Sequence, residues 1–320
     1  MLRILRAHTA HELDQLRSRW ESCKSAAGSV FQTFKWAQMA AMVFAAVEAP
    51  LVVAAESDAG FAIIPAALCT GTRAMGLLGE TLFDYRNVIH SGDRNVLRRA
   101  WSELALLEAP LGVTALRGER EREEWGEFAP EFFCNAPAVR CRDISSEQFL
   151  VAHNRLGRQS RRLRKLGVAL RHHDGSDSRL ISWIYEQKGT QEGSVFAEAR
   201  RREFMVRICA AAPAACDVFT YESETECVAA LVTFRHEATR HFYTVYFNPV
   251  WAQYSPGQVL VYEATAASLA EGLDCDYMTG EYPYKNRLAT HMVPLFKVQA
   301  SAERIAEVAG LRVSPAAQAA

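Results

Sequence analysis

The sequence predicts a mixed α/β (α+β) protein made of two similar halves, each a mixed sheet flanked by helices. Stretches rich in β-branched and aromatic residues alternate with stretches whose apolar residues recur at helical spacing. The order strand, helix, helix, three strands, helix, strand occurs in the first half and again in the second. A length of 320 residues suits two domains of this kind.

The elements can be placed from these patterns. In the first half, strands are expected at 2–7, 51–56, 61–69, 72–78 and 113–116, and helices at 10–23, 31–45 and 95–107. In the second half, strands are expected at 168–172, 217–221, 227–235, 240–248, 273–278 and 293–298, and helices at 178–188, 198–212 and 255–271. The strand at 240–248 alternates Phe242, Thr244 and Tyr246 with Tyr243, Val245 and Phe247, which predicts two opposite faces. We expect a domain at 1–140, a domain at 141–310 and a disordered tail at 311–320.

A strongly marked helix start follows the strand at 240–248. Ser255 suits the N-cap, Pro256 suits the first helical position, and Gln258 suits the third position of a capping box. Gly257 adds no side chain, so a ligand can approach the backbone amides at the positive end of the helix dipole. That arrangement suits a pyrophosphate. The same residues also simply begin a helix well, and the sequence leaves both interpretations open.

One segment of the chain is strongly basic. Residues 148–173 contain seven Arg and Lys residues and no acid. On a helix, Arg155, Arg158, Arg162 and Lys165 share one face. This face could bind a phosphorylated donor, a nucleotide-linked sugar or a lipid headgroup. The alternatives are a solvated face screened by salt and, as a lesser option, contact with RNA.

Short motifs along the chain resemble a known family. The motifs are Phe31-Gln32-Thr33 with Trp36, Asp84-Tyr85-Arg86, Arg164-Lys165-Leu166-Gly167, Tyr246-Phe247-Asn248-Pro249, Ser255-Pro256-Gly257, and Asp276-Tyr277 through Gly280 to Tyr284-Lys285. The order of strands and helices resembles the GNAT acyltransferase fold, present twice. The local sequences of these motifs resemble the CelD/BcsL-like acetyltransferases, relatives of the Fem-type aminoacyl ligases. The resemblance covers roughly residues 31–297 and is strongest over 243–285.

The resemblance implies an acyl donor in the second half and an acceptor side in the first. Acetyl-CoA or another acyl-CoA would place its pantetheine arm between two splayed strands that flank the Ser255 helix, with no metal required. The residues implied to bind the donor are Tyr246, Asn248, Ser255, Pro256, Gly257 and Gln258. The residues implied to bind the acceptor are Asp84, Tyr85 and Arg86, together with Arg158, Arg162 and Lys165 of the basic segment.

Acyl transfer also needs proton transfers. Tyr284 is the candidate acid for the leaving thiolate, Asp276 or Glu281 the candidate base, and Lys285 a candidate ligand of an anionic substrate group. His291 is a further candidate base. An ordinary exposed turn at Tyr282-Pro283-Tyr284-Lys285 is the alternative interpretation of this segment.

Composition narrows the class of protein. Hydrophobic residues make up 49% and charged residues 23% of the chain, with a net charge of −1, which argues against a globally basic nucleic-acid binder. No apolar run approaches the length of a membrane span, and no signal-peptide pattern opens the chain, so a cytoplasmic protein is expected. The eight cysteines are scattered without a Cys-x-x-Cys pair and are expected to be reduced thiols.

These observations favour an acyl-CoA-dependent transferase that acylates an amino or hydroxyl group of a cell-envelope or exopolysaccharide precursor, such as a small molecule or a lipid- or nucleotide-linked sugar. The first alternative is a Fem-like ligase that uses aminoacyl-tRNA, which is the one case that would involve nucleic acid. The second is a noncatalytic binding module of the same fold. The sequence specifies neither the acceptor nor the oligomeric state.

Overall fold

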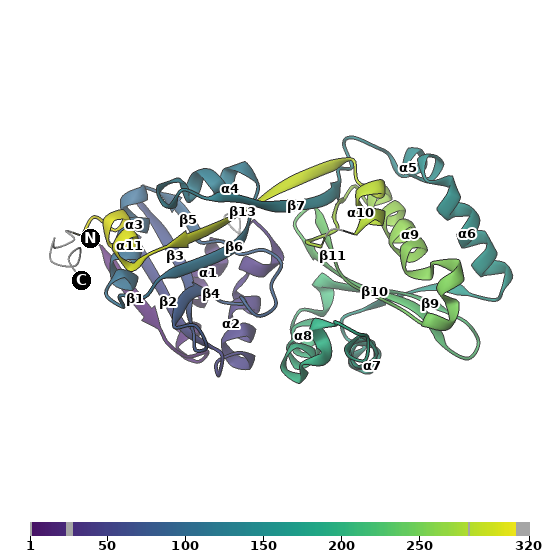
Figure 1. The fold of residues 1–320 in the computed structure, drawn as a ribbon, viewed down its shortest axis with the longest axis horizontal. Helices are drawn as coiled ribbons and strands as arrows, with labels where there is room; N and C mark the ends of the chain where they lie inside the picture. Colours follow the sequence, from purple (N-terminus) through teal and green to yellow (C-terminus); the bar gives the residue numbers. More distant parts are fainter. Residues whose placement is uncertain (1, 24–27, 281, 312–320) are drawn as a thin grey trace. The chain divides into compact units, whose positions relative to one another are not determined.

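The computed structural model describes residues 2–23, 28–280 and 282–311. The chain forms two compact units, one of Met1–Cys134 with Pro294–Ala320 and one of Asn135–Val293 (Figure 1). The sequence predicts a boundary at residue 140 and keeps 294–310 in the second domain. The contacts instead assign the segment from Pro294 onward to the first unit. The tail predicted at 311–320 lies, except for Leu311, outside the described residues.

The first unit has a mixed sheet in the order β1-β2-β3-β4-β6-β13, with β5 paired to β3. Its strands are β1 (Arg3–Ala7), β2 (Glu48–Ser57), β3 (Gly60–Cys69), β4 (Ala74–Leu77), β5 (Ile89–Gly92), β6 (Leu111–Arg117) and β13 (His291–Ala300). Its helices are α1 (Arg17–Ser22), α2 (Phe34–Val43), α3 (Arg94–Ala105), α4 (Gly118–Glu124) and α11 (Ala302–Val308). Among the described residues of this unit, only β4 and β6 pair in parallel. Trp101, Trp125 and Phe128 stack edge to face or tilted in the core that α3 covers.

The second unit has a mixed sheet in the order β7-β12-β11-β10-β9-β8. Its strands are β7 (Glu131–Val139), β8 (Ala169–Asp174), β9 (Cys216–Glu222), β10 (Cys227–His236), β11 (Thr239–Phe247) and β12 (Asp274–Asp276). Its helices are α5 (Ser146–Ala152), α6 (Asn154–Lys165), α7 (Ser178–Gly189), α8 (Ala199–Ala211), α9 (Pro256–Ala270) and α10 (Pro283–Leu288). Here β11 and β12 form the parallel pair.

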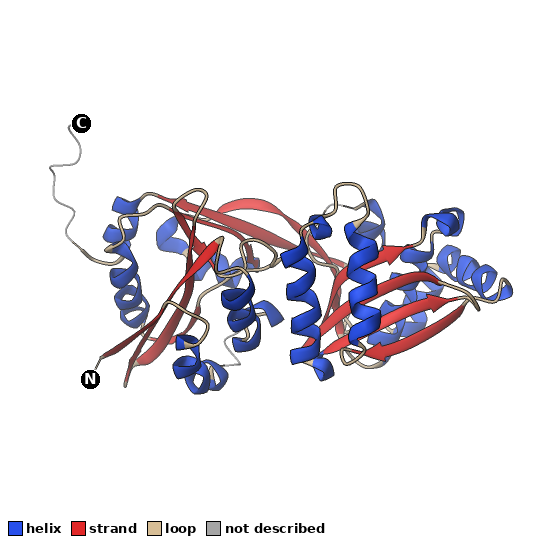
Figure 2. Cartoon of the chain, turned by 90° about the horizontal axis from the view of Figure 1, so that it is seen from below, coloured by secondary structure: helices blue, strands red, loops and turns tan. Residues whose placement is uncertain are grey.

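Helices cover both faces of this second sheet (Figures 1 and 2). Helices α7 and α8 lie on one face, where the Tyr185 hydroxyl of α7 donates to Thr244 Oγ1 of β11 at 3.1 Å. Helices α5, α6 and α9 lie on the other face. Helix α9 is buried on most sides because it lies between the sheet and the α5–α6 pair, which explains its nearly continuous apolar sequence.

The last strand of each sheet arrives from an unexpected part of the chain. In the first unit β13 pairs antiparallel with β6, from Leu295↔Arg117 to Ala300↔Leu111. In the second unit β7, which precedes the other strands of that unit, pairs antiparallel with β12 through Cys275↔Val139. The segment at 293–298 is a strand, as predicted, but its apolar alternation does not reveal which sheet it joins.

A β-bulge interrupts β11 at Tyr243. Val232 of β10 pairs with Thr244, whereas the next residue, Thr233, pairs with Phe242, so Tyr243 is an extra residue on β11. The bulge reverses the alternation of the side chains. Phe242 and Val245 therefore both join the core beneath α9, and the prediction that they lie on opposite faces is wrong.

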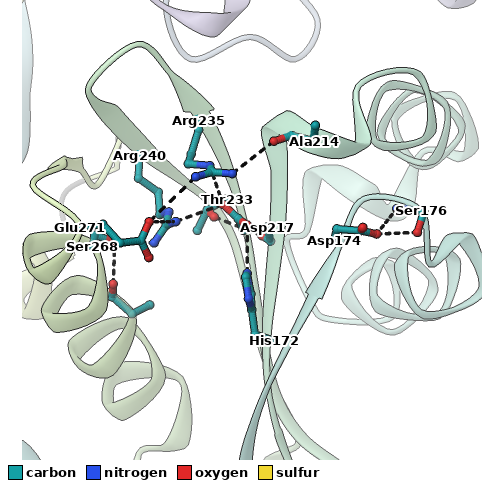
Figure 3. A network of polar contacts seen from close by, with 11 residues as sticks. His172, Asp174, Ser176, Ala214, Asp217, Thr233, Arg235, Arg240, Ser268 and Glu271 are labelled. Carbon is teal, nitrogen blue, oxygen red and sulfur yellow. Dashed lines mark hydrogen bonds and ion pairs between the residues drawn. The ribbon is translucent and has the colours of Figure 1, made fainter.

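A buried polar network fixes the C-terminal end of α9 to the start of β11 (Figure 3). Arg240 of β11, which is 1% exposed, donates to Ser268 Oγ at 2.8 Å and to carboxylates of Asp217 and Glu271 at 3.1 Å. His172 and Arg235 also contact Asp217. The paired charges compensate one another's desolvation. The network fixes the position of α9 along β11. This position in turn sets where α9 begins.

The eight cysteines are free thiols. No helix within the described residues is both long enough and apolar enough to cross a membrane.

Candidate functional site

The second unit contains a cavity of about 570 Å³ where β11 and β12 separate. The two strands pair over three residues, from Thr239↔Asp274 to His241↔Asp276. Strand β12 then ends, whereas β11 continues to Phe247. The cavity is lined by Lys188, Val195, Phe196, Phe242, Tyr243, Thr244, Val245, Phe247, Ala252, Ser255, Gly257, Gln258, Val261, Tyr277, Thr279, Gly280, Tyr282, Tyr284 and Lys285. The strands that flank α9 therefore splay apart, as the resemblance implied.

The walls of the cavity come from both faces of the sheet. On one side lie the first turns of α9, with Ser255, Gly257 and Gln258. On the other side lie Lys188 of α7 and Phe196 of the following short 3-10 helix (Val195–Ala197). Because α7 and α9 cover opposite faces, two ligands could approach one point from opposite sides of the sheet.

Ser255 begins α9 in an unexpected conformation. Its backbone lies in the left-handed region at φ 50° and ψ 48°, and its side chain makes no capping hydrogen bond. The predicted N-cap interaction and capping box are therefore wrong, because an N-cap side chain needs an extended backbone to reach the first-turn amides. A 3-10 helix (Pro249–Tyr254) runs directly into Ser255, which forces this reversal. Pro256 occupies the first helical position, as predicted. The first turn of α9 consequently receives no side-chain acceptor from its own cap residue.

Gly257 lets α9 start close to β11. A Cβ atom placed there would lie 3.1 Å from Val245 Cγ1 and 3.6 Å from Phe247 Cδ1. Helix–strand packing therefore requires the missing side chain independently of any ligand. Gly257 and Gln258 both line the cavity.

Three predicted donor residues, Tyr246, Asn248 and Pro256, lie outside the cavity lining. Tyr246 is 5% exposed and packs edge to face with Trp183 of α7, at 5.4 Å between ring centroids. Asn248 caps the 3-10 helix, since its Oδ1 accepts from Val250 N at 3.0 Å and its Nδ2 donates to Glu226 Oε2 at 2.6 Å. Tyr246 and Asn248 both shape the turn that leads to α9.

Tyr284 and Lys285 lie together on α10 in the wall of the cavity. Burial, and secondarily the neighbouring Tyr282, raises the pKa of Tyr284 to about 12, so its phenol stays protonated at neutral pH. Lys285 is 9% exposed, and its Nζ donates to the Thr279 carbonyl at 2.6 Å and lies 5.3 Å from the Tyr282 ring centroid. The segment therefore combines exposed residues, Tyr282 and Pro283, with two residues of α10, Tyr284 and Lys285, that are at least partly buried in the cavity wall.

Asp276 and His291, two of the candidate bases, lie outside the cavity lining. Asp276 is 1% exposed and does not line the cavity; its Oδ1 accepts from Met278 N at 2.9 Å, and its Oδ2 lies 3.8 Å from His241 Nδ1. His291 contacts the guanidinium of Arg140, and it too is outside the cavity lining. Glu281 lies outside the described residues.

Two of the predicted acceptor residues of the first unit, Tyr85 and Arg86, are buried and contact other residues of that unit. Arg86 is 7% exposed and donates to the Glu80 carbonyl at 2.8 Å and to Thr114 Oγ1 at 2.9 Å, while its Nε lies 2.9 Å from Glu80 Oε2. Tyr85 is 1% exposed and packs against Phe31. Asp84 is half-buried. A binding role for these three residues stays a prediction.

The basic segment forms α5, α6 and the start of β8. Gly157, Ser160 and Leu163 form the buried face of α6, which packs on α9. The predicted basic face points outward, with Arg158, Arg162 and Lys165 all exposed. The Arg162 guanidinium lies 5.6 Å from the Tyr254 ring centroid, one residue before Ser255. The outward face of α6 thus adjoins the start of α9.

Sequence reasoning missed Lys188. It lies in the last turn of α7, lines the cavity and has a pKa lowered by burial. A single lysine near the end of an amphipathic helix carries no motif, and only the fold shows that it faces the cavity. Within the described residues, no group of three or more His, Cys, Asp and Glu side chains could hold a metal ion.

The segment that contains the cavity is similar to known proteins. Residues 152–286, which include α6 to most of α10 and the whole cavity lining, match the family model described as an acetyltransferase (GNAT) domain. A search of curated proteins finds no match to the sequence.

Several solved structures share the fold. FemX aligns with a TM-score of 0.59 at 10% identity, over 96% of this chain and 99% of that chain. A tandem GNAT protein from the clavulanic acid biosynthesis pathway aligns at 0.54 and 9%, over 94% and 99%. The C-terminal domain of a putative lysylphosphatidylglycerol synthetase from Agrobacterium fabrum aligns at 0.60 and 9%, over 92% and 95%. At these identities the likeness shows the fold alone. The fold is the mixed α/β fold of tandem GNAT proteins, as predicted; the CelD/BcsL resemblance stays a prediction.

Proposed function

We propose that the protein is an acyl-CoA-dependent N- or O-acyltransferase, with acetyl-CoA or a related acyl-CoA as donor, that acts on a cell-envelope or exopolysaccharide precursor. The observation that carries the proposal is the cavity between β11 and β12 beside the uncapped start of α9, inside the segment that matches the GNAT domain. The acceptor class rests on the CelD/BcsL resemblance alone.

The donor fits this site through backbone groups. The first-turn amides of α9 and the helix dipole favour the pyrophosphate, and Gly257 and Gln258, which line the cavity, supply these amides in the proposal. Beyond His241 the β12-facing edge of β11 has no partner in β12, so its amide and carbonyl groups can pair with the two amides of a pantetheine arm. Tyr246, Asn248 and Pro256 act in the proposal by shaping the approach to α9.

The reaction needs few side chains. The nucleophilic nitrogen or oxygen of the acceptor attacks the thioester carbonyl carbon, the carbon–sulfur bond breaks, and the thiolate takes a proton. Tyr284, whose phenol is protonated at neutral pH, gives that proton in this scheme and regains one from water. Asp276 or Glu281 takes the proton of the acceptor in this scheme, and Lys285 positions the loop that begins at Thr279. Arg158, Arg162 and Lys165 attract phosphorylated ligands, donor or acceptor, towards the cavity over a distance, without fixing the side on which the acceptor finally binds.

Calorimetric titration with acetyl-CoA tests the proposal. We expect a dissociation constant in the micromolar range for acetyl-CoA, and weaker binding of S-acetylpantetheine, which lacks the diphosphate that α9 would hold. Release of free thiol in the presence of an amine acceptor then measures turnover. Absence of acetyl-CoA binding contradicts the proposal.

The second candidate is a Fem-like ligase that uses aminoacyl-tRNA. The outward basic face of α6 beside the start of α9 favours it. Retention of tRNA at physiological salt without acetyl-CoA binding would select this candidate. Failure of both ligands would leave a noncatalytic binding module.

A further inference from the structure

Lys188 is a cavity residue that the proposed reaction does not use. Its Nζ donates to the neutral amide oxygen of Gln191 at 2.8 Å. Over the described part of the chain it forms no ion pair with a carboxylate. The cavity around it is lined mainly by apolar and aromatic side chains, among them Val195 and Phe196. An ammonium group in such surroundings has lost hydration without gaining a counter-charge.

The position of Lys188 separates it from the donor side. Lys188 belongs to α7, which covers the face of the sheet opposite α9. Its partner Gln191 donates to the Phe247 carbonyl at 3.5 Å, which holds the pair beside the end of β11. The proposed pyrophosphate site lies at the start of α9, across the strand. A ligand that reaches Lys188 therefore contacts the cavity from the α7 face, opposite the proposed pyrophosphate site.

The other cations near the cavity differ from Lys188. Lys285 donates to the Thr279 carbonyl and lies over the Tyr282 ring, so it already serves the cavity wall. The arginines of the outward α6 face are exposed to water, which screens them. Lys188 combines partial burial, a neutral partner and a place on the α7 face of the cavity. An anionic group in contact with its ammonium would restore the missing counter-charge.

We propose that Lys188 binds an anionic group of the acceptor, a carboxylate or a phosphate, and so selects amines or alcohols that carry a negative charge. This inference rests on the proposed function, because it assumes that the acceptor occupies the α7 side of the cavity. Lys188 acts as a specificity residue in this account: it holds the acceptor by its charge, while the reacting nitrogen or oxygen faces the donor thioester.

The test compares matched acceptors that differ in charge. Acetyl transfer from acetyl-CoA is measured with phosphoethanolamine against ethanolamine, glucosamine 6-phosphate against glucosamine, and β-alanine against β-alaninamide. We expect kcat/KM of the wild type to favour the anionic member of at least one pair by about tenfold or more. Lys188→Met should remove that preference by raising the KM of the anionic member more than the KM of the neutral member. Lys188→Arg should restore part of it. Lys35→Met, an exposed lysine of α2 in the first unit, should behave as wild type.

A second measurement tests anion binding at the same site without catalysis. Inorganic phosphate at constant ionic strength should raise the melting temperature of the wild type and of Lys35→Met more than that of Lys188→Met. An equal rise in all three proteins, or a charge preference that persists in Lys188→Met, overturns the inference. Loss of acetyl-CoA binding in the wild type overturns the proposed function instead, and the phosphate comparison still decides whether Lys188 is an anion site.

Discussion

The two units share an order of elements but differ where the parallel strands separate. In the second unit, the end of β11 borders a cavity of about 570 Å³. In the first unit, the corresponding end of β4 borders a space of about 10 Å³, lined by Leu77, Phe83, Tyr85 and Arg86 among others. The same topology therefore gives an open site in one unit and a packed core in the other.

The difference comes from the segment that follows each strand. After β4, the chain folds back so that Arg86 bridges the turn at Gly79 and Glu80 to Thr114 of β6. Phe83 and Tyr85 pack on Phe31 in the same place. After β11, the chain instead forms a short 3-10 helix and turns at Ser255, which leaves the space between the strands free.

The helices that follow these strands, α3 and α9, also begin differently. Asp93 caps α3, since its Oδ1 accepts from Asn95 N at 2.9 Å, so a carboxylate of the chain already occupies that helix start. Ser255 provides no such acceptor to α9. A duplicated fold can thus keep one helix start for a ligand and use the other for stability.

The largest expected effect concerns catalysis. Tyr284→Phe should lower kcat by about 100-fold or more, with donor affinity unchanged, because only the proton donor is removed. Tyr85→Phe, in the packed counterpart of the first unit, should leave kcat near wild type. Steady-state kinetics and acetyl-CoA titration of both variants check this. Equal kcat in Tyr284→Phe and wild type would move the acid elsewhere.

The next largest effect is expected on the stability of the first unit. Arg86→Met should lower the free energy of unfolding by about 3–5 kcal/mol, because it leaves the Glu80 carboxylate and several carbonyls without their buried partner. Denaturant unfolding measures the loss, and acetyl-CoA titration should show an unchanged dissociation constant. If stability holds and the KM of the acceptor rises instead, the original prediction of an acceptor-binding Arg86 is correct.

The pH dependence of stability should distinguish the units as well. Burial raises the pKa of Glu121 of the first unit to about 8, so the folded state binds its proton more tightly than the unfolded state does. Its contribution is present below pH ~4.5 and is lost as the pH rises through about 8. Glu121→Gln should therefore be more stable than wild type at pH 8.5, by about 2–3 kcal/mol, and nearly equal to it at pH ~4.5. Melting temperatures across this range check the sign; a difference independent of pH contradicts it.

The two helix starts allow a smaller, paired test. Asp93→Ala should cost about 1 kcal/mol of stability and leave acetyl-CoA affinity unchanged. Gly257→Asp should weaken acetyl-CoA binding by about 1–3 kcal/mol, through like charge, and should also lower the melting temperature, since its Cβ meets Val245. The reverse assignment, with donor affinity lost in Asp93→Ala, would place the donor in the first unit.

The smallest effect on stability is expected on α6. Reversing Arg158 and Arg162 to Glu should change the free energy of unfolding by about 0.5 kcal/mol or less, because both side chains are exposed. If this face attracts a phosphorylated acceptor, activity at low salt should fall and become nearly insensitive to ionic strength. Activity that keeps its wild-type salt response would make the face a solvated surface.

The order of elements was largely predictable from the sequence, because strands and helices carry strong periodic patterns. The start of α9 was predicted at the correct residue from Pro256, although the conformation of Ser255 was not. Alternation along β11 failed at Tyr243, since a bulge adds one residue without changing the residue types. The pairing of β13 with β6 was also beyond reach, because an apolar strand pattern does not name its partner.

The site was predictable where chemistry accompanies a turn and unpredictable where only packing decides. Tyr284 and Lys285 follow Pro283 in a short segment, and both lie in the cavity wall. The family resemblance implied that Arg86 binds the acceptor, whereas packing engages its guanidinium with Thr114 and Glu80 of its own unit. No motif in the sequence marked Lys188 as a site residue. Its candidacy depends on α7 facing the gap between β11 and β12.

Hydrogen exchange with and without acetyl-CoA tests most directly whether the second unit alone holds the donor. We expect slower exchange on binding at the backbone amides of 243–247 in β11 and of Gly257 and Gln258 in α9, which border the cavity. The counterpart amides of the first unit, around Arg86 and at Asn95 in α3, should exchange as before. Protection at the start of α3, or acetyl-CoA binding with no protection along β11 and α9, would contradict the account.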